Sequence, residues 1–256
     1  METIVSRGIV ASYHKKLMEN LSVDVAIVGG GPSGLVAAAT LAKAGKKVAL
    51  FERKLAPGGG MWGGAMMFNQ IVVQQDAVEI LDEYGITREP FEAGYWLCDS
   101  VEATAALIFA AKKAGATIFN CYSVEDVVFQ NSTVAGVVVN WTPVQSAGMH
   151  VDPLVIMAKS VLDSTGHPCE VSRLLASKND VTLNTPTGGV VGERSLSIEE
   201  GERTTVENTK EIFPGLFVSG MAANGVCGSF RMGPIFGGML NSGKKVTRLI
   251  IEKLDA

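Results

Sequence analysis

The chain has 256 residues, of which 47% are hydrophobic, and its 22 basic and 26 acidic residues give a net charge of -4. This length is enough for a single domain with its own core. The lack of a Lys and Arg cluster argues against a nucleic-acid partner. Four dispersed cysteines favour reduced thiols over disulfides or a zinc site. With no signal-type segment and no membrane-length apolar run, we expect a cytoplasmic chain without a membrane partner.

Residues 3–20 have apolar side chains at helical spacing near one face, namely Ile4, Ile9, Val10, Tyr13 and Leu17. This pattern predicts an amphipathic helix that packs on the domain or on a neighbouring subunit. No chemistry is assigned to it.

The strongest local pattern follows this helix. An apolar strand over 23–28 leads into the turn GGGPSG, a small-residue helix over 35–44 and a second strand over 47–51. Such an order predicts a βαβ unit. In the turn, Gly29, Gly31 and Gly34 have the spacing G-x-G-x-x-G, which suits a tight turn, a pyrophosphate close to the backbone, and close packing of helix on strand.

Polar groups beside this turn complete a predicted dinucleotide site. The helix amino terminus offers N–H groups to a phosphate, and the Ser33 hydroxyl adds a donor. Glu52 lies 21 residues past Gly31, where a carboxylate can accept ribose hydroxyls. Arg53 could stack on adenine or neutralise phosphate. An ordinary tight turn is the alternative, but strand, glycines, helix, strand and acid in register favour the dinucleotide site.

The remaining segments predict the rest of an α/β fold. Residues 57–68 are too glycine-rich for a stable helix core and suit a backbone surface folded against a ligand. Residues 94–153 are predicted as a small β-rich subdomain. Strands over 154–162 and 215–219 return to the core. We therefore expect one Rossmann-type dinucleotide-binding domain over residues 1–256, with an inserted antiparallel β layer.

The pattern from Val23 to Glu52, with the later DSTG and GLFVSGM, resembles the two-dinucleotide-binding flavoproteins. In that family the last strand normally ends in Gly-Asp, and the carboxylate holds the flavin. Here Met221 follows Gly220, which argues against flavin. The same resemblance implies that the backbone of Val124 contacts adenine and that Gly60 faces the dinucleotide.

Two loop histidines are candidate metal ligands. His150 and Asp152 lie in GMHVDP and His167 lies in DSTGHPC, on either side of the strand that begins at Leu154. Imidazole nitrogen with carboxylate oxygen suits Fe(II), with zinc or manganese also compatible. From spacing alone, a turn-capping His167 and a solvated Asp152 are the simpler interpretation.

The intervening strand restricts how these loops could share an ion. A strand of roughly 11 residues spans on the order of 35 Å, so its two ends cannot easily meet around one metal within a subunit. If both loops bind metal, two protomers share the site, and the protein is at least a dimer.

Over residues Ser6 to Leu254 the chain is similar to the archaeal thiazole synthases, which make the thiazole half of thiamine. The segments that carry the resemblance are SRGIV, GGGPSG, PGGGMWGG, GMHVDP, DSTGH and SGM…GSFRMGP…GGM…SG. It implies a transferase-type enzyme that uses NAD as a substrate: nicotinamide leaves, the ribose becomes a ketose, glycine condenses, and sulfur closes the ring of an adenosine diphosphate thiazole carboxylate.

The resemblance also implies roles for particular residues. Iron(II) would be bound by Asp152 and by His167 of the adjacent protomer, in a homo-oligomer that family likeness suggests is an octamer. Arg231 would clamp the glycine carboxylate, as a guanidinium suits. The dinucleotide would be lined by Met221 and by His150, Val151 and Asp152.

The sulfur donor follows from one position. Eukaryotic members have a sulfur-donating cysteine two residues before the matching Asp, whereas this chain has His150, as archaeal members do. The resemblance therefore implies free sulfide and multiple turnovers. His150 is a candidate catalytic acid or base, with a plain loop histidine as the alternative. Cys169 and Cys227 could donate sulfur instead, but no neighbouring cation favours their activation.

Three other functions are compatible with the same dinucleotide-binding sequence pattern. They are an FAD- or NAD-dependent oxidoreductase of the same fold, a ribose-phosphate isomerase, and a non-catalytic dinucleotide sensor.

Overall fold

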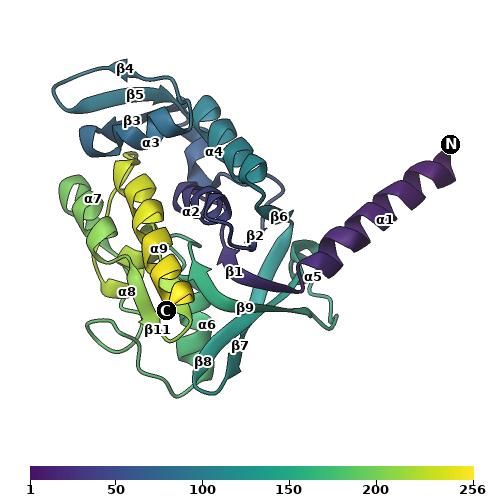
Figure 1. The fold of residues 1–256 in the computed structure, drawn as a ribbon. Coiled ribbons are helices and arrows are strands. Elements are labelled where there is room, and N and C mark those ends of the chain that lie inside the picture. Colours follow the sequence, from purple (N-terminus) through teal and green to yellow (C-terminus); the bar gives the residue numbers. More distant parts are fainter.

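A computed structural model describes residues 1–256. Its centre is a sheet of eight strands whose continuous part runs β11-β12-β9-β1-β2-β6 (Figure 1). Neighbouring strands from β12 to β6 are parallel, and β11, β7 and β8 are antiparallel to their partners. The eight strands are β1 (Ser22–Val28), β2 (Val48–Glu52), β6 (Thr117–Asn120), β7 (Tyr122–Gln130), β8 (Thr133–Trp141), β9 (Leu154–Asp163), β11 (Lys210–Phe213) and β12 (Leu216–Val218).

Strand β9 joins the parallel and antiparallel parts of this sheet. Its carboxyl half pairs with β1 and β12, while residues Leu154–Met157 pair with the hairpin strand β8. The α/β class with a mainly parallel sheet and added antiparallel strands is therefore confirmed. Residues 94–153, expected as one β-rich subdomain, supply strands both to this sheet and to a separate small one.

Two small sheets and several short helical elements lie outside the central sheet. Strands β3 (Gln70–Gln74), β5 (Tyr95–Asp99) and β4 (Glu89–Pro90) form an antiparallel sheet, and β10 (Arg194–Leu196) pairs in parallel with β13 (Phe230–Arg231). The short helical elements are η1 (Gly59–Gly63), η2 (Gln75–Ala77), α3 (Val78–Glu83), α5 (Thr142–Ser146), α6 (Glu170–Lys178), α7 (Ile198–Glu207) and α8 (Met221–Cys227).

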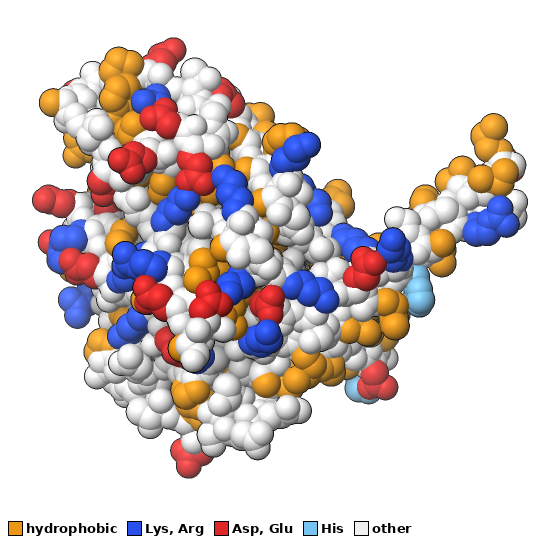
Figure 2. All heavy atoms as spheres, in the orientation of Figure 1, with side chains coloured by type: hydrophobic (Ala, Val, Ile, Leu, Met, Phe, Trp, Pro, Cys, Tyr) orange, Lys and Arg blue, Asp and Glu red, His pale blue; other side chains and the backbone are white.

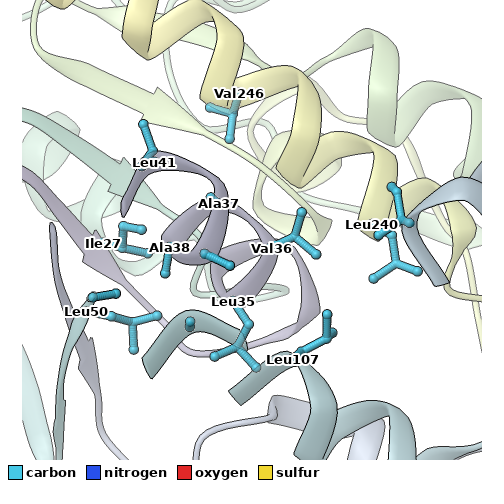
Figure 3. Packing of buried hydrophobic residues seen from close by; sticks show 14 of the residues in the cluster. Ile27, Leu35, Val36, Ala37, Ala38, Leu41, Leu50, Leu107, Leu240 and Val246 are labelled. Carbon is cyan, nitrogen blue, oxygen red and sulfur yellow. The ribbon is translucent and has the colours of Figure 1, made fainter. Parts of the chain in front are cut away.

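Three longer helices cover one face of the sheet: α2 (Pro32–Lys43), α4 (Ser100–Ala114) and α9 (Gly237–Asp255) (Figure 1). The larger apolar core lies between these helices and the sheet, and it includes Leu35, Leu107 and Leu240 from the helices and Ile27 and Leu50 from β1 and β2 (Figure 3). Small residues let α2 and α9 cross closely, because a side chain at Gly243 would begin 2.6 Å from the Ser33 carbonyl oxygen. This packing fixes the amino end of α2 against the sheet.

Helix α1 (Glu2–Glu19) has the predicted conformation, but most of it extends away from the body (Figure 1). Only its last turns pack, where the Tyr13 and Tyr122 hydroxyls lie 2.6 Å apart. The apolar side chains of Ile4, Ile9 and Val10 are each at least 65% exposed, and Figure 2 shows hydrophobic atoms at the surface of the projecting helix. No helix in the structure has the length and apolar character needed to cross a membrane.

Candidate functional site

The glycine turn between β1 and α2 has the geometry that its spacing predicts. Gly29 has φ +97°, and a side chain there would begin 2.4 Å from the Ser164 carbonyl oxygen. A side chain at Gly34 would begin 2.3 Å from the Gly29 carbonyl oxygen, so α2 packs tightly on the strand. Gly31, by contrast, faces open space, and a Cβ added there would meet no atom within 4 Å. Of the three glycines in this motif, Gly31 is therefore the one whose backbone a ligand can approach closely.

A cavity of about 690 Å³ opens in front of this turn, within the size range of small-molecule sites. The side chains of Arg53, Lys54 and Arg231 in its lining and the amino end of α2 favour an anionic ligand. Most of the sequence-predicted site residues line it: Ser33, Glu52, Arg53, Gly60, Val124, His167, Met221 and Arg231.

Glu52 at the end of β2 is 6% exposed and is held by two backbone donors. Its two carboxylate oxygens accept hydrogen bonds of 2.8 Å from the N–H groups of Gly30 and Lys54. Each oxygen keeps a second lone pair for a further donor. Ser33, also buried, donates its hydroxyl to Ser219 at 2.6 Å, and Arg53 forms an ion pair with Glu170.

The glycine-rich stretch after β2 folds back over the turn. Gly58 donates its N–H to the Gly30 carbonyl at 2.6 Å, and the Trp62 indole N–H donates to the Pro57 carbonyl at 2.7 Å. Gly60 follows with open space beyond its Cα. The stretch therefore forms a backbone surface on one wall of the cavity, as its composition predicts.

A buried carboxylate fixes the turn from β9 to α6 that carries His167. Asp163 is fully buried and accepts hydrogen bonds from the backbone N–H and hydroxyl of Thr165 and of Ser172, at 2.6–3.1 Å. The Thr165 hydroxyl accepts in turn from the N–H of Glu170 at 2.8 Å. This network orders the loop and leaves the His167 side chain at the cavity rim, 51% exposed.

Arg231 also lines the cavity, at the end of β13. Its side chain is exposed to the cavity and forms no ion pair or hydrogen bond within the chain. The neighbouring Met232 is buried against α7, where the Thr205 hydroxyl lies 3.6 Å from the methionine sulfur. Arg231 is thus a free guanidinium on an anchored backbone. Met221 begins α8 and is 5% exposed against the same cavity.

The structure does not bring His150, Val151 and Asp152 to this cavity. They are exposed in the loop before β9, and the Val151 carbonyl accepts a hydrogen bond from the Asn140 side chain at 2.9 Å. His167 follows the far end of the same strand. No cluster of three or more His, Cys, Asp or Glu side chains suited to a metal occurs within the chain.

The cysteines are unpaired, and three of them are poor nucleophiles in this environment. Burial raises the pKa of the Cys169 thiol to about 12 and that of Cys98 to about 11, and it also raises the pKa of Cys227. A thiol with a raised pKa is mostly protonated at neutral pH. These properties agree with the sequence interpretation of Cys169 and Cys227 as inert.

Behind the Arg231 loop lies a buried carboxyl group that no sequence motif indicates. Glu202 on α7 is 6% exposed and accepts hydrogen bonds from the N–H of Gly238 at 2.5 Å and from the Gln74 side chain at 2.7 Å. One of its oxygens has no partner. Burial raises the pKa of Glu202 from 4.5 to about 7.

We expect Glu202→Gln to be more stable than the native chain at pH 8, with a smaller difference at pH 5. Because the folded pKa lies above the unfolded value, native stability falls as pH rises through this interval, by on the order of 3 kcal/mol. An amide keeps the acceptor and removes the buried charge. Urea unfolding from pH 5 to 8 at fixed protein concentration tests this, with the exposed Glu199→Gln as control. A pH-independent difference would contradict it.

The roles of two further side chains at the site could not be predicted from the sequence. Asp163 begins the DSTG motif, but no spacing indicates that its carboxylate is buried and accepts a hydrogen bond from Ser172 on the following helix. Glu193, which contacts His167, lies in a segment with no motif. Both act through tertiary contacts that no local spacing shows.

The fold and cavity define an α/β protein of the Rossmann type, with a glycine-rich turn at the amino end of α2. A model of the Thi4 family matches residues 6–236. The thiamine thiazole synthase of Methanothermobacter thermautotrophicus is 55% identical over 250 residues, 98% of this chain and 97% of that protein. That of Pyrococcus abyssi is 52% identical over 254 residues, 99% and 98% of the two chains.

A solved structure agrees with these relatives. The crystal structure of Thermovibrio ammonificans THI4 matches with a TM-score of 0.98 and 54% identity, covering 100% of this chain and 99% of that one. The chain belongs to the Thi4 family. The predicted membership among thiazole synthases, enzymes of thiamine thiazole biosynthesis, is thereby confirmed.

Proposed function

We propose that the protein converts NAD, glycine and free sulfide into an adenosine diphosphate thiazole carboxylate, with release of nicotinamide. The observation that carries this proposal is that one cavity contains both the glycine turn at α2 and the unpaired guanidinium of Arg231. A dinucleotide and a small carboxylate could therefore be held side by side. Family membership supports thiazole formation as the outcome.

Residues on three sides of the cavity suit NAD. The N–H groups at the start of α2 and the Ser33 hydroxyl would hold the diphosphate at Gly31. Free lone pairs of Glu52 would accept ribose hydroxyls. Arg53 and the backbone of Val124 would contact the adenine. Gly60 and Met221 would form further walls. Because His150, Val151 and Asp152 do not reach this chain's own cavity, they would line the dinucleotide bound to a neighbouring protomer.

Arg231 is well suited to orient glycine. A planar guanidinium grips a carboxylate through two parallel hydrogen bonds, and no side chain competes for this one. Its anchored backbone, with Met232 buried beside it, would limit the movement of the bound amino acid. The free amino group of glycine would then face the ribose-derived carbon chain.

An iron(II) ion would require two protomers. His167 presents a half-exposed imidazole at the cavity, while Asp152 is exposed beyond the other end of β9. Imidazole and carboxylate are donors that Fe(II) accepts, so the donor set fits if the neighbouring protomer supplies one of the two. Bound iron would supply Lewis-acid polarisation of the reacting groups.

A homo-oligomer is further supported by α1. A helix that projects from the body with exposed Ile4, Ile9 and Val10 is suited to pack on another subunit. We infer an assembly with sites shared between adjacent protomers, an octamer by family likeness. The four unpaired cysteines support a reducing, cytoplasmic setting.

Free sulfide as the donor is supported by the thiols and by His150. Cys169 and Cys227, with their raised pKa values, are not poised to release sulfur, and His150 occupies the place of the donor cysteine in eukaryotic members. We infer multiple turnovers. In the assembled site His150 would be placed near the substrate as a catalytic acid or base.

The test is mass spectrometry of small molecules released after anaerobic incubation with NAD, glycine, Fe(II) and sulfide. We expect an adenylated thiazole in molar excess over the enzyme, and none when sulfide is omitted. One product per chain without sulfide would instead indicate a protein-derived sulfur atom. Unchanged NAD would favour a dinucleotide sensor, released flavin an oxidoreductase, and a ketose without ring closure an isomerase.

A further inference from the structure

The His167 ring is held by a carboxylate from a distant segment. Its Nδ1 atom lies 2.5 Å from Oε1 of Glu193, and Glu193 pairs with no Lys or Arg. The Glu193 side chain is only 18% exposed, whereas that of His167 is 51% exposed. One ring nitrogen is therefore occupied inside the protein, and Nε2 is left without a partner at the cavity rim.

The backbone on both sides of Glu193 is fixed. The N–H of Gly192 donates to the Gly225 carbonyl at 2.8 Å, and the N–H of Arg194 donates to the Ser229 carbonyl at 2.9 Å. The Arg194 guanidinium packs on the Phe230 ring, 5.5 Å from its centroid, and does not pair with Glu193. The carboxylate is thus positioned before any ligand binds.

The turn that carries His167 packs on α8, the helix that also contains Gly225. Cys169 is buried against α8, with its sulfur 3.6 Å from the Ala222 carbonyl oxygen. A side chain at Gly225 would begin 2.3 Å from that sulfur, so the two segments meet with no spare room. Because both segments rest on α8, the pair is part of the built site and differs from a mobile surface ion pair.

We propose that Glu193 is a positioning residue that accepts the Nδ1 hydrogen of His167, fixes its tautomer, and directs the Nε2 lone pair into the cavity. The metal role of His167 rests on the proposed function above; the tautomer assignment does not. A ligating histidine commonly donates its second N–H to a carboxylate, which orients the ring and increases its donor strength. Glu193 would supply that interaction here.

The first measurement needs no metal. In 15N-histidine-labelled protein, recorded at a pH where the ring nitrogen shifts themselves show a neutral imidazole, we expect a protonated Nδ1 and an unprotonated Nε2 for His167. Its signals are identified by their loss in His167→Asn. Glu193→Ala should shift them toward the tautomer mixture of a free imidazole. An unchanged Nδ1–H tautomer in Glu193→Ala would overturn the proposal.

The second measurement uses Co(II) as the metal, followed by its visible absorption. Glu193→Ala is expected to weaken binding by about 10- to 100-fold. Glu193→Gln should recover most of the affinity, because its amide oxygen still accepts the Nδ1 hydrogen. Equal losses in Glu193→Gln and Glu193→Ala would indicate a direct ligand and would overturn the positioning role.

Controls separate this inference from the proposed function. Glu199→Ala removes an exposed carboxylate and should leave both readouts unchanged. Circular dichroism of the Glu193 variants checks that the fold is retained. If the native protein binds no Co(II), the metal assignment fails, and the tautomer measurement alone decides whether Glu193 positions His167.

Discussion

Gly34→Ala is expected to destabilise the protein by about 3 kcal/mol or more, because overpacking of a rigid site cannot be relieved by a side-chain movement. The new methyl carbon would lie 2.3 Å from the Gly29 carbonyl oxygen and 2.6 Å from the Ser164 hydroxyl. Helix α2 cannot move away, since Pro32 through Ala39 are all buried. Urea unfolding and the yield of soluble protein measure the loss.

Gly31→Ala is the matched variant and should separate binding from folding. Its backbone, with φ -73° and ψ 178°, is one that alanine adopts readily, and its new methyl group would enter open space. We expect stability within about 1 kcal/mol of the native chain. If the NAD diphosphate rests there, affinity should fall by about 10-fold or more. Native NAD affinity in Gly31→Ala would place the diphosphate elsewhere.

These two glycines also illustrate what the sequence could predict. The βαβ unit is specified locally, since the apolar strands, the glycine spacing and the acidic residue at the end of β2 all lie within residues 23–52. The structure brings Ser33, Glu52 and Arg53 to one cavity, as that spacing requires. Arg231 and Met221, placed by family resemblance, line the same cavity from a segment far away in the chain.

Features that depend on long-range contacts could not be predicted from local sequence patterns. The antiparallel sheet of β3, β4 and β5 assembles from strands whose own pattern is weak. Residues 3–20 predicted an amphipathic, packed helix, but the apolar residues of α1 do not gather on one face, and this chain alone offers a partner only to its last turns. Glu193 reaches His167 through the folding of residues 191–194 onto α8, which leaves no trace in either local sequence.

The length of β9 could be predicted from the sequence, and it determines how far apart Asp152 and His167 lie within one chain. The loop with Asp152 and the turn with His167 flank a strand of 10 residues, which at about 3.3 Å per residue separates them by roughly 30 Å. A metal bound by both must therefore join two subunits. Asp152→Asn and His167→Asn should each lose nearly all activity when every protomer carries the same substitution.

Co-expression of the two variants with different affinity tags should restore activity in the mixed oligomers. In a randomly assembled mixture, about a quarter of the sites would receive Asp152 from one protomer and His167 from its neighbour. A site contained in one chain would give none. The control is the reciprocal mixture of the native chain with the double variant. If the sites are shared between protomers, about a quarter of all sites in this mixture would be active. If each site lies within one chain, about half would be active. Activity from complementing protomers would therefore show that the subunit interface is part of the catalytic machinery, which makes assembly a requirement for catalysis.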